Sequence, residues 1–322
     1  MRTQNIRKVG LKTKSAKVDN LVVAVVGPTA TGKSDLAVIL AKHLCGEVIS
    51  ADSRQVYKGL HIGTGKITPR EMRGVPHHLL DIISPKKRFS VQEYATIAKK
   101  KILEIQHRDH VPIVCGGTGF YIQALIDDIV LPDVPPNEKL RKSLSLKKTD
   151  DLFTMLERKD PRRAKEMKKN GDFKNARRII RALEIVATLG SVPKQEKNRN
   201  IKQKYKTIFI GLTLPPEELK ERIHARLLAR LKKGMVAEAK NLHKNGLSYK
   251  RMRELGLEYR HLAIYLESNQ TKADKEKMID GLLKDIYQYA KRQMTWFKRD
   301  KRIHWISPNT PLKTILELVY KA

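Results

Sequence analysis

The sequence has 322 residues, with 66 Lys and Arg against 34 Asp and Glu and a formal net charge of +32. Such an excess repels itself in a compact chain and favours a polyanionic partner, for which nucleic acid is the leading candidate. Cys45 and Cys115 lie in apolar segments without paired spacing, which argues against a disulfide scaffold or a zinc finger, and no apolar run approaches the roughly 18 residues of a membrane helix.

The first predicted elements follow a basic N-terminal arm, residues 1–20. The arm lacks the apolar stretch of a secretory signal, so we expect it to be flexible and the protein to be cytoplasmic. The apolar run 21–26 is typical of a strand buried on both faces of a parallel sheet, and residues 34–44 follow as a helix.

The loop between that strand and helix reads GPTATGKS, residues 27–34, and matches the pattern G-x-x-x-x-G-K-[ST]. Gly27 and Gly32 allow the tight turn that points successive N–H groups at phosphate oxygens, and the start of the helix adds its positive end. Lys33 contributes a charge and Ser34 a hydroxyl for Mg²⁺. The loop therefore predicts a bound diphosphate or triphosphate.

Two further strands are predicted at 47–53 and 111–119, with a helix at 91–109 between them. This alternation predicts a P-loop NTPase-like, doubly wound parallel α/β sheet, in which ligands bind at the carboxyl ends of the strands. The third strand ends in Cys and Gly and lacks the carboxylate typical of ATPases and kinases, which weakens the ATP interpretation. The second strand ends near Asp52, which could accept a proton from a nucleophile, or could instead cap a helix or hold a Mg²⁺-bound water.

The character of the chain changes near residue 127, after a Pro-rich segment. We interpret 127–206 as an inserted helical domain, since its helical part, 137–206, carries 22 Lys and Arg against 9 Asp and Glu. The core would then comprise 21–126 and 207–322. Its second part begins with a strand at 207–214 and ends in a strand and a short helix, and its predicted long helices are 216–245, 254–267 and 274–300.

Several segments occur in an order that resembles the tRNA dimethylallyltransferases (tRNA isopentenyltransferases) of bacterial type, from near residue 21 almost to the end. They are GPTATGKS, ISADSRQVYKGLHIGTGK, VPHHLLDI, FSVQEYATIA, PIVCGGTGFYIQALI, ARRIIRALEI and AKRQMTWFKRD. The resemblance implies transfer of the dimethylallyl group of dimethylallyl diphosphate to N6 of the adenosine 3′ to the tRNA anticodon. It also implies a monomer that uses Mg²⁺ and binds the anticodon stem-loop through the insertion, with no membrane partner.

The resemblance assigns roles residue by residue. Asp52 would accept the N6 proton, Thr29 would lie near the reacting centre, and Arg226 would lie over the diphosphate, with Arg222 as the alternative one helical turn earlier. The expected diphosphate-binding residues, with Mg²⁺ near Ser34, are Gly27, Pro28, Thr29, Ala30, Thr31, Gly32, Lys33 and Ser34. The expected tRNA-binding residues are Asp52, Ser53, Arg54, Gln55, Thr118, Arg141, Arg177, Arg178, Ile179, Ile180 and Arg181.

One segment departs from the family pattern, and two other functions remain alternatives. In RELGLEYR (253–260), Tyr259 follows the glycine by three residues, whereas many members have Gly-Tyr directly. A P-loop kinase would explain the loop but leaves the basic insertion without a purpose. A non-catalytic RNA-binding protein would leave Lys33, Ser34 and Asp52 idle.

Overall fold

The computed structural model describes residues 20–129, 131–194 and 205–321, so nearly all of the predicted basic arm lies outside the described residues. The chain divides into two compact units. The core unit comprises residues 1–128 and 202–322, and the inserted unit comprises residues 129–201.

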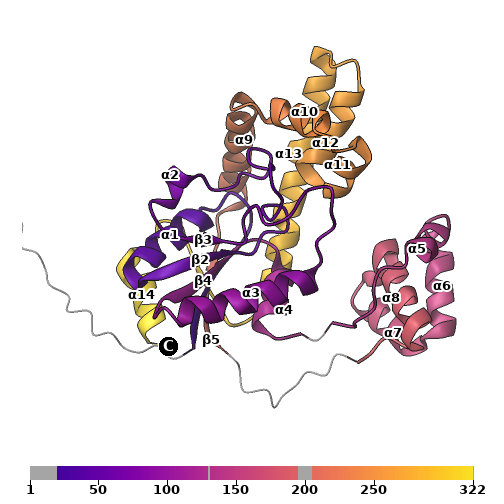
Figure 1. Ribbon diagram of the computed structural model, residues 1–322, viewed down its shortest axis with the longest axis horizontal. Helices are drawn as coiled ribbons and strands as arrows, with labels where there is room; N and C mark the ends of the chain where they lie inside the picture. The colour runs from indigo at the N-terminus through magenta and orange to yellow at the C-terminus, as the bar shows by residue number, and fades with distance from the viewer. Residues whose placement is uncertain (1–19, 130, 195–204, 322) are drawn as a thin grey trace, which may run out of the picture. The chain divides into compact units, whose positions relative to one another are not determined.

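A six-stranded sheet forms the centre of the core unit, with strand order β3-β2-β4-β1-β5-β6 and every neighbouring pair parallel (Figure 1). The strands are β1 (Leu21–Val26), β2 (Gly46–Ser50), β3 (His77–His78), β4 (Val111–Cys115), β5 (Lys206–Leu212) and β6 (Ile303–Ile306). The central strand β1 is buried along its whole length, and Val23 is in register with Ile113 on β4 and Ile208 on β5. The continuous apolar run thus reflects a strand with protein on both faces.

Helices cover both faces of the sheet, as expected for a doubly wound fold. Val22, Ala24 and Val26 pack with α3 (Val91–Gln106) and α4 (Gly119–Ile126) on one face. The alternate side chains of β1 pack on the other face with α1 (Lys33–Leu44) and α14 (Leu312–Tyr320). A short helix, α2 (Pro69–Met72), precedes β3.

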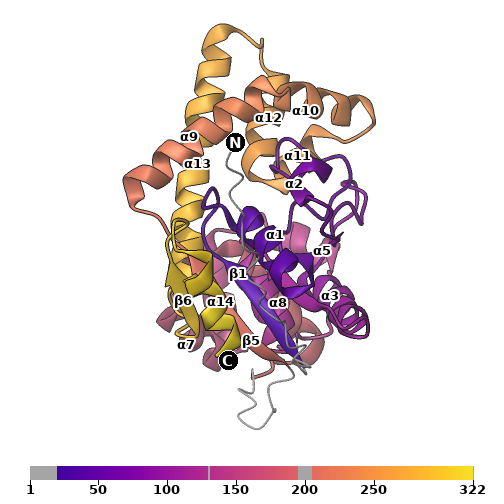
Figure 2. The same ribbon diagram turned by 90° about the vertical axis from the view of Figure 1, so that its left-hand side faces the viewer.

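A helical lobe with its own apolar core completes this unit. Its helices are α9 (Pro216–Lys232), α10 (Met235–Lys244), α11 (Tyr249–Leu255), α12 (Leu257–Glu267) and α13 (Lys272–Phe297). The single helix predicted for 216–245 is wrong, because Gly234 adopts a φ of 97° and starts a new helix. Figures 1 and 2 both show α13 running from this lobe to the sheet, so it can connect the two parts of the core unit.

The inserted unit is all helical around a small core that includes Leu152, Leu156 and Ile179. Its helices are α5 (Glu138–Leu144), α6 (Thr149–Lys159), α7 (Pro161–Lys169), a 3-10 turn (Asp172–Lys174) and α8 (Ala176–Leu189). Asp160 is buried and its carboxylate accepts hydrogen bonds from the amides of Arg163 and Val192, which ties the start of α7 to the end of the unit.

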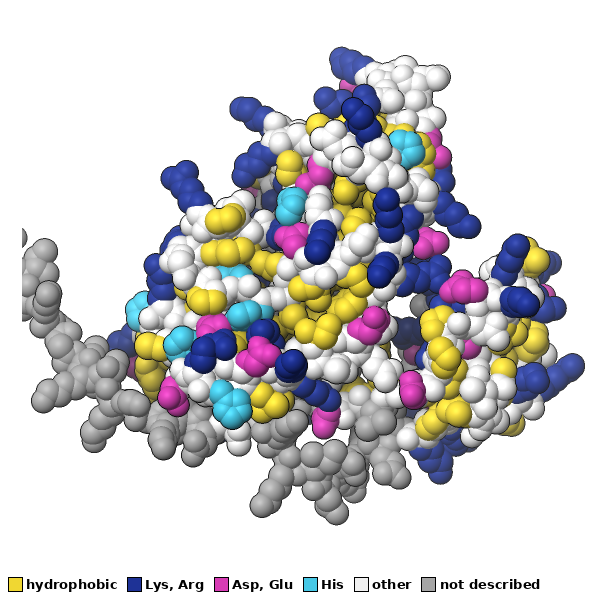
Figure 3. Space-filling model, viewed as in Figure 1, with side chains coloured by type: hydrophobic (Ala, Val, Ile, Leu, Met, Phe, Trp, Pro, Cys, Tyr) yellow, Lys and Arg dark blue, Asp and Glu magenta, His cyan; other side chains and the backbone are white. Residues whose placement is uncertain are grey.

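The charged surface agrees with the composition. On the face viewed in Figure 3, Lys and Arg side chains project around the margin of α9–α12. None of the helices in the described part of the chain is both long and apolar enough to span a bilayer.

Candidate active site

The phosphate loop between β1 and α1 depends on its two glycines. Gly27 has a φ of 133°, and a Cβ there would lie 2.4 Å from the Leu212 carbonyl oxygen. Gly32 has a φ of 88° and begins α1. The buried Thr31 hydroxyl donates to the Pro28 carbonyl oxygen at 2.9 Å, which closes the turn from within. The two glycines and this internal hydrogen bond therefore define the shape of the loop.

Lys33 lies folded against this loop, with its ammonium group donating to the Pro28 carbonyl oxygen. Burial, helped by the charge of the nearby Arg226, lowers its pKa to about 8, although Cys115 and Asp52 act in the opposite direction. A desolvated ammonium without a fully compensating anion is costly. The position therefore suits a bound anion.

Arg226, on α9, brings a second cation to the loop. Its guanidinium donates to the Thr29 hydroxyl at 3.3 Å and to the Gly65 carbonyl oxygen at 3.2 Å. Burial and the neighbouring Arg230 lower the pKa of Arg226. Arg222, one turn earlier, instead pairs with Glu218 at 2.9 Å on an exposed surface. Of the two arginines weighed from the sequence, it is Arg226 that reaches the loop.

Asp52 follows β2 at the same edge of the sheet. Its Oδ1 atom accepts hydrogen bonds from the amides of Arg54 at 2.8 Å and Gln55 at 3.3 Å, so it caps the turn 52–55. Its Oδ2 atom accepts no hydrogen bond from any residue that the structure describes. One oxygen thus caps a turn, not the helix considered from the sequence, and the other remains available to a ligand.

Thr118 is placed beside Asp52 by the turn after β4. The Thr118 hydroxyl accepts a hydrogen bond from the Ser53 amide at 3.0 Å, and the Thr118 amide donates to the Ala51 carbonyl oxygen at 3.2 Å. A Cβ on Gly116 would lie 2.2 Å from that same carbonyl oxygen, which explains the glycine. The structure therefore brings Thr118 and the segment 52–55 together.

A long loop after β2 is held in place by one carboxylate. Glu238 on α10 accepts hydrogen bonds from the successive amides of His61, Ile62 and Gly63, at 2.6–2.9 Å, and from the Tyr259 hydroxyl at 2.7 Å. Tyr259 is almost fully buried, so in the displaced RELGLEYR segment it is a packing residue.

The turn before Tyr259 still adjoins the predicted site. Gly256 lies beside the guanidinium groups of Arg54 and Arg260, and its φ of 77° joins α11 to α12. Arg54 is one of the predicted tRNA-binding residues, so this turn faces the segment 52–55.

Sequence reasoning assigned no role to Gln293, although it lies in the quoted segment AKRQMTWFKRD. Gln293 is buried, and its amide links the Thr29 amide of the phosphate loop to the Gly117 carbonyl oxygen, each at 2.9 Å. The only signal in the sequence was a polar residue on the apolar side of an amphipathic helix.

The predicted tRNA-binding residues of the inserted unit differ in their environments. Arg141 and Arg181 both hydrogen-bond to Glu184, which is almost fully buried. Ile179 lies in the core of the unit, so its side chain is not available to a ligand, and Ile180 is partly buried. The two arginines at the start of α8 are exposed. Arg178 pairs with Asp172, whereas Arg177 makes no side-chain hydrogen bond or ion pair with the described residues.

The residues near the loop offer few ligands for a metal ion. No group of three or more His, Cys, Asp or Glu among the described residues is arranged to hold one. The hydroxyl of Ser34 and the carboxylate of Asp35 are exposed in the first turn of α1. This donor set fits an ion such as Mg²⁺, which usually keeps several waters and is held largely by substrate phosphates.

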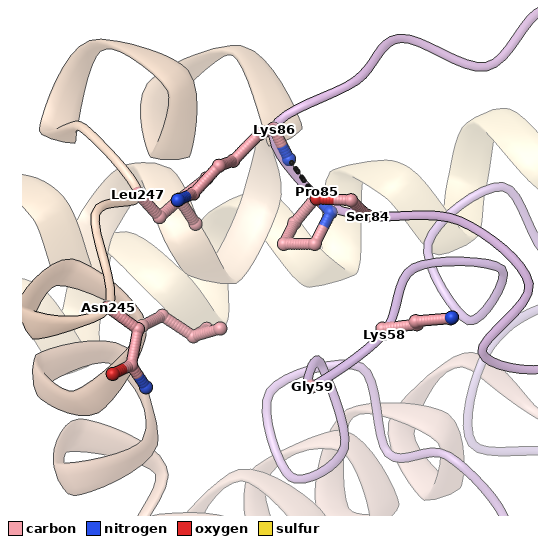
Figure 4. Close-up of a pocket in the computed structure, with 8 residues that line it drawn as sticks. Lys58, Gly59, Ser84, Pro85, Lys86, Asn245 and Leu247 are labelled. Atoms are coloured by element: carbon pink, nitrogen blue, oxygen red, sulfur yellow. Dashed lines mark hydrogen bonds between the residues drawn. The ribbon is translucent and has the colours of Figure 1, made fainter.

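A separate cavity of about 280 Å³ contains none of these residues (Figure 4). It lies where Lys58 and Gly59 of the loop after β2 and the segment 84–86 meet the end of α10, including Leu242 and Asn245. It is at the lower limit of small-molecule sites and holds no predicted catalytic group.

The sequence is similar to one protein family along most of its length. The model of the IPP transferase family matches residues 55–300. A tRNA dimethylallyltransferase 2 of Treponema denticola is 42% identical over 290 residues, covering 88% of this chain and 95% of its own length. A tRNA dimethylallyltransferase of Bacillus subtilis is 38% identical over 297 residues, with 90% and 92% covered.

Two solved structures are similar along most of the chain. A tRNA isopentenylpyrophosphate transferase from Bacillus halodurans aligns with a TM-score of 0.67 at 37% identity, covering 94% of this chain and 95% of that one. A eukaryotic dimethylallyltransferase acting on tRNA aligns with a TM-score of 0.78 at 26% identity, covering 94% and 80%. Together with the parallel sheet, these likenesses confirm the α/β fold class.

Proposed function

Since the chain belongs to the IPP transferase family, we propose that it transfers the dimethylallyl group of dimethylallyl diphosphate to N6 of the adenosine 3′ to the anticodon of tRNA. One observation carries this proposal. Lys33 and Arg226 both contact the phosphate loop, and Asp52, which has one carboxylate oxygen without a hydrogen bond among the described residues, lies at the same edge of the sheet. The bond from the allylic carbon to the diphosphate oxygen breaks, and a carbon–nitrogen bond to N6 forms. The products are N6-(dimethylallyl)adenosine and diphosphate.

The phosphate loop acts on the leaving group. An allylic diphosphate departs with negative charge developing on its oxygens, and preorganised donors in a desolvated site stabilise such charge strongly. Lys33, Arg226 and the amides of residues 30–34 supply these donors, and the Thr29 hydroxyl lies beside Arg226. The lowered pKa of Lys33 supports the assignment, because a bound diphosphate would stabilise the ammonium form.

Asp52 acts on the acceptor. An exocyclic amine is a poor nucleophile until it can lose its proton, and the free Oδ2 atom of Asp52 is the acceptor for that proton. The capping bonds to Oδ1 hold the carboxylate in one orientation. The target adenine must leave the anticodon-loop stack to reach it, which costs a few kcal/mol and least where the base is unpaired.

Binding of tRNA is assigned to two sets of residues. Ser53, Arg54, Gln55 and Thr118 lie around Asp52 and would contact the acceptor nucleoside and its neighbours. In the inserted unit, the exposed Arg177 and Arg178 would contact tRNA phosphates. Arg141 and Arg181 would contact the tRNA while they remain hydrogen-bonded to Glu184. Phosphate contacts of this kind fix the position of a nucleic acid without reading its sequence.

The proposal includes Mg²⁺, a monomeric protein and a cytoplasmic location. The Ser34 hydroxyl would hold the ion together with diphosphate oxygens, and the ion would add charge neutralisation on the leaving group. Monomer and location follow from the resemblance and from the tRNA substrate.

Prenyl transfer tests the proposal directly. Purified protein is incubated with Mg²⁺, dimethylallyl diphosphate and an unmodified anticodon stem-loop, and the digested nucleosides are analysed by mass spectrometry. Asp52→Asn is the informative variant, because the asparagine carbonyl can still cap the amides of Arg54 and Gln55 but cannot act as a base. Asp280→Asn on the exposed side of α13 is the matched control.

The wild type and the control should form N6-(dimethylallyl)adenosine at the same rate. Asp52→Asn should be slower by about 10²–10⁴-fold with an unchanged melting temperature. Equal rates in Asp52→Asn would reduce Asp52 to a turn cap. Absence of product together with ATP hydrolysis would indicate that the loop binds a nucleotide and would overturn the proposed function.

A further inference from the structure

One face of α13 follows the turn after β4. Tyr289, Gln293 and Trp296 are spaced four and three residues apart, so they lie on the same side of the helix. They meet three successive residues: Gln293 contacts Gly117, Tyr289 interacts with the Thr118 side chain, and Trp296 packs on Gly119. The turn that carries Thr118 is therefore braced by one long helix.

The helix lies so close to the turn that positions 117 and 119 have no room for a side chain. A Cβ at Gly117 would lie 2.1 Å from Gln293 Nε2, and a Cβ at Gly119 would lie 2.3 Å from Trp296 Nε1. Neither glycine has a positive φ, so the reason for glycine here is space rather than backbone conformation.

Gln293 differs from its two neighbours because it also reaches the phosphate loop. Its Oε1 atom accepts the Thr29 amide hydrogen at 2.9 Å, and its Nε2 atom donates to the Gly117 carbonyl oxygen at 2.9 Å. The two partners fix the orientation of the amide, since one can only donate and the other can only accept. An ionised carboxylate could make only the first of these bonds.

These contacts link the two halves of the proposed reaction. Thr29 belongs to the loop assigned to the leaving group, and its hydroxyl contacts Arg226. Gly117 precedes Thr118, whose hydroxyl binds the Ser53 amide next to Asp52. Gln293 is the buried side chain that joins these two sides directly.

We propose that Gln293 is a positioning residue, whose amide sets the spacing between the diphosphate cradle and the Asp52–Thr118 acceptor side. This inference rests on the proposed function. Reacting atoms must be held at about 3–3.5 Å, and a displacement of about 1 Å can cost 10²-fold in rate. Gln293 touches neither reactant in this role, so it should affect the chemical step more than the binding of either substrate.

Gln293→Met tests the bridge, because methionine has a similar length but forms neither hydrogen bond. Under single turnover, the rate of prenyl transfer should fall by about 10–100-fold. The dissociation constants of dimethylallyl diphosphate and of the anticodon stem-loop, measured separately, should change by less than about threefold. Gln288→Met, at an exposed position of the same helix, is the matched control and should behave as the wild type.

Gln293→Glu gives a second readout that loss of packing would not produce. A protonated carboxyl group has one donor and one acceptor, as the glutamine amide has, whereas the ionised form lacks the donor. The rate of this variant divided by that of the wild type should therefore rise as the pH falls from 8 to 5. The ratio removes the pH dependence that Asp52 and the substrates share in both proteins.

Hydrogen exchange tests the bridge without any turnover. In the Gln293→Met protein, the Thr29 amide should exchange about 10–100-fold faster than in the wild type, because its acceptor is lost. An unchanged single-turnover rate in Gln293→Met, or a flat rate ratio for Gln293→Glu across this pH range, would overturn the inference. If the wild type forms no product, the proposed function fails, whereas exchange at Thr29 still decides whether the bridge exists.

Discussion

The charge of Lys33 lies in an unfavourable environment. Burial lowers its pKa to about 8, and its only hydrogen-bond partner among the described residues is the Pro28 carbonyl oxygen. A diphosphate would replace this neutral partner with an anion and raise the pKa. Binding of the diphosphate is therefore linked to protonation of Lys33.

This linkage predicts a pH-dependent affinity. In the proposed function the ammonium form would bind the diphosphate, so affinity should be constant below pH 8 and weaken above it, by up to about tenfold per pH unit. Isothermal titration with dimethylallyl diphosphate at pH 7, 8 and 9 would measure this, and proton uptake should increase with pH. In Lys33→Met, affinity should be low and the weakening above pH 8 should be absent. A wild-type affinity that does not change between pH 7 and 9 would contradict the assignment.

Arg226 and Arg222 form a natural pair for comparison, because they lie one turn apart on α9. Only Arg226 reaches the phosphate loop, whereas Arg222 forms an exposed ion pair with Glu218. We expect Arg226→Met to lower kcat/KM by about 10²-fold, as for loss of one preorganised donor, and Arg222→Met to leave it within about twofold. Steady-state kinetics of both variants would check this, and the reverse ranking would favour the alternative, Arg222, as the arginine that acts on the diphosphate.

At the scale of elements, α8 carries exposed arginines in its first turn and, one turn later, Arg181, which binds the buried Glu184. Although burial alone would raise the pKa of Glu184, hydrogen bonds from Arg141, the Asn137 amide and Arg181 hold it below its ordinary value. The lowered pKa contributes stability above the pKa of the unfolded chain, and this contribution is lost as the pH falls through the folded value. Arg177 has no such partner among the described residues, so its charge is free for a ligand.

This difference predicts that substitutions of Arg177 and of Arg141 have different effects. Arg177→Ala should weaken binding of the anticodon stem-loop and reduce the salt slope by about one, with an unchanged melting temperature. Arg141→Ala should destabilise the inserted unit, because removing one partner of a buried carboxylate leaves charge uncompensated. Fluorescence anisotropy and calorimetry would separate the two effects. A stability loss in Arg177→Ala without a binding loss would contradict the assignment.

At the scale of the whole molecule, the net charge of +32 predicts strongly salt-dependent tRNA binding. Each neutralised phosphate contributes a slope of roughly −0.7 to −0.9 in a plot of log affinity against log salt. We expect a slope steeper than about −3 for the anticodon stem-loop between 50 and 200 mM KCl, which corresponds to roughly four phosphate contacts. Dimethylallyl diphosphate should show a much shallower slope, because it carries a single diphosphate group rather than a row of phosphates. A shallow slope for the stem-loop would contradict the proposal that the basic surface binds tRNA phosphates.

Much of the architecture could be predicted from local patterns. The strand 21–26 appears in the structure with its predicted bounds, as β1. The strand 207–214 and the helix 91–109 appear as β5 and α3, with ends displaced by up to three residues. The strand β1 is a continuous apolar run, and α3 begins with the Ser90 and Glu93 capping box. Such signals act within one or two turns of chain, so sequence alone can show them.

Other elements were missed or merged because their cause lies elsewhere in the chain. The two-residue strand β3 exists because its backbone pairs with Val48 and Ile49 of β2. The helix α4 begins at the glycine-rich turn that the sequence suggested as the end of a strand. The break between α9 and α10 depends on the positive φ of Gly234. Each of these depends on a tertiary partner or on one backbone angle.

The sequence by itself determined the phosphate loop, the family and the excess of positive charge, because these depend on residue type and spacing alone. Only the tertiary structure decided which arginine of α9 reaches Thr29, which oxygen of Asp52 is free, and that Arg141 and Arg181 bind a buried carboxylate. Gln293 lies 264 residues from Thr29 in the chain, and its role is set by the packing of α13 against the turn after β4. Hydrogen bonds between distant segments depend on the positions of whole elements, and no local pattern records those positions.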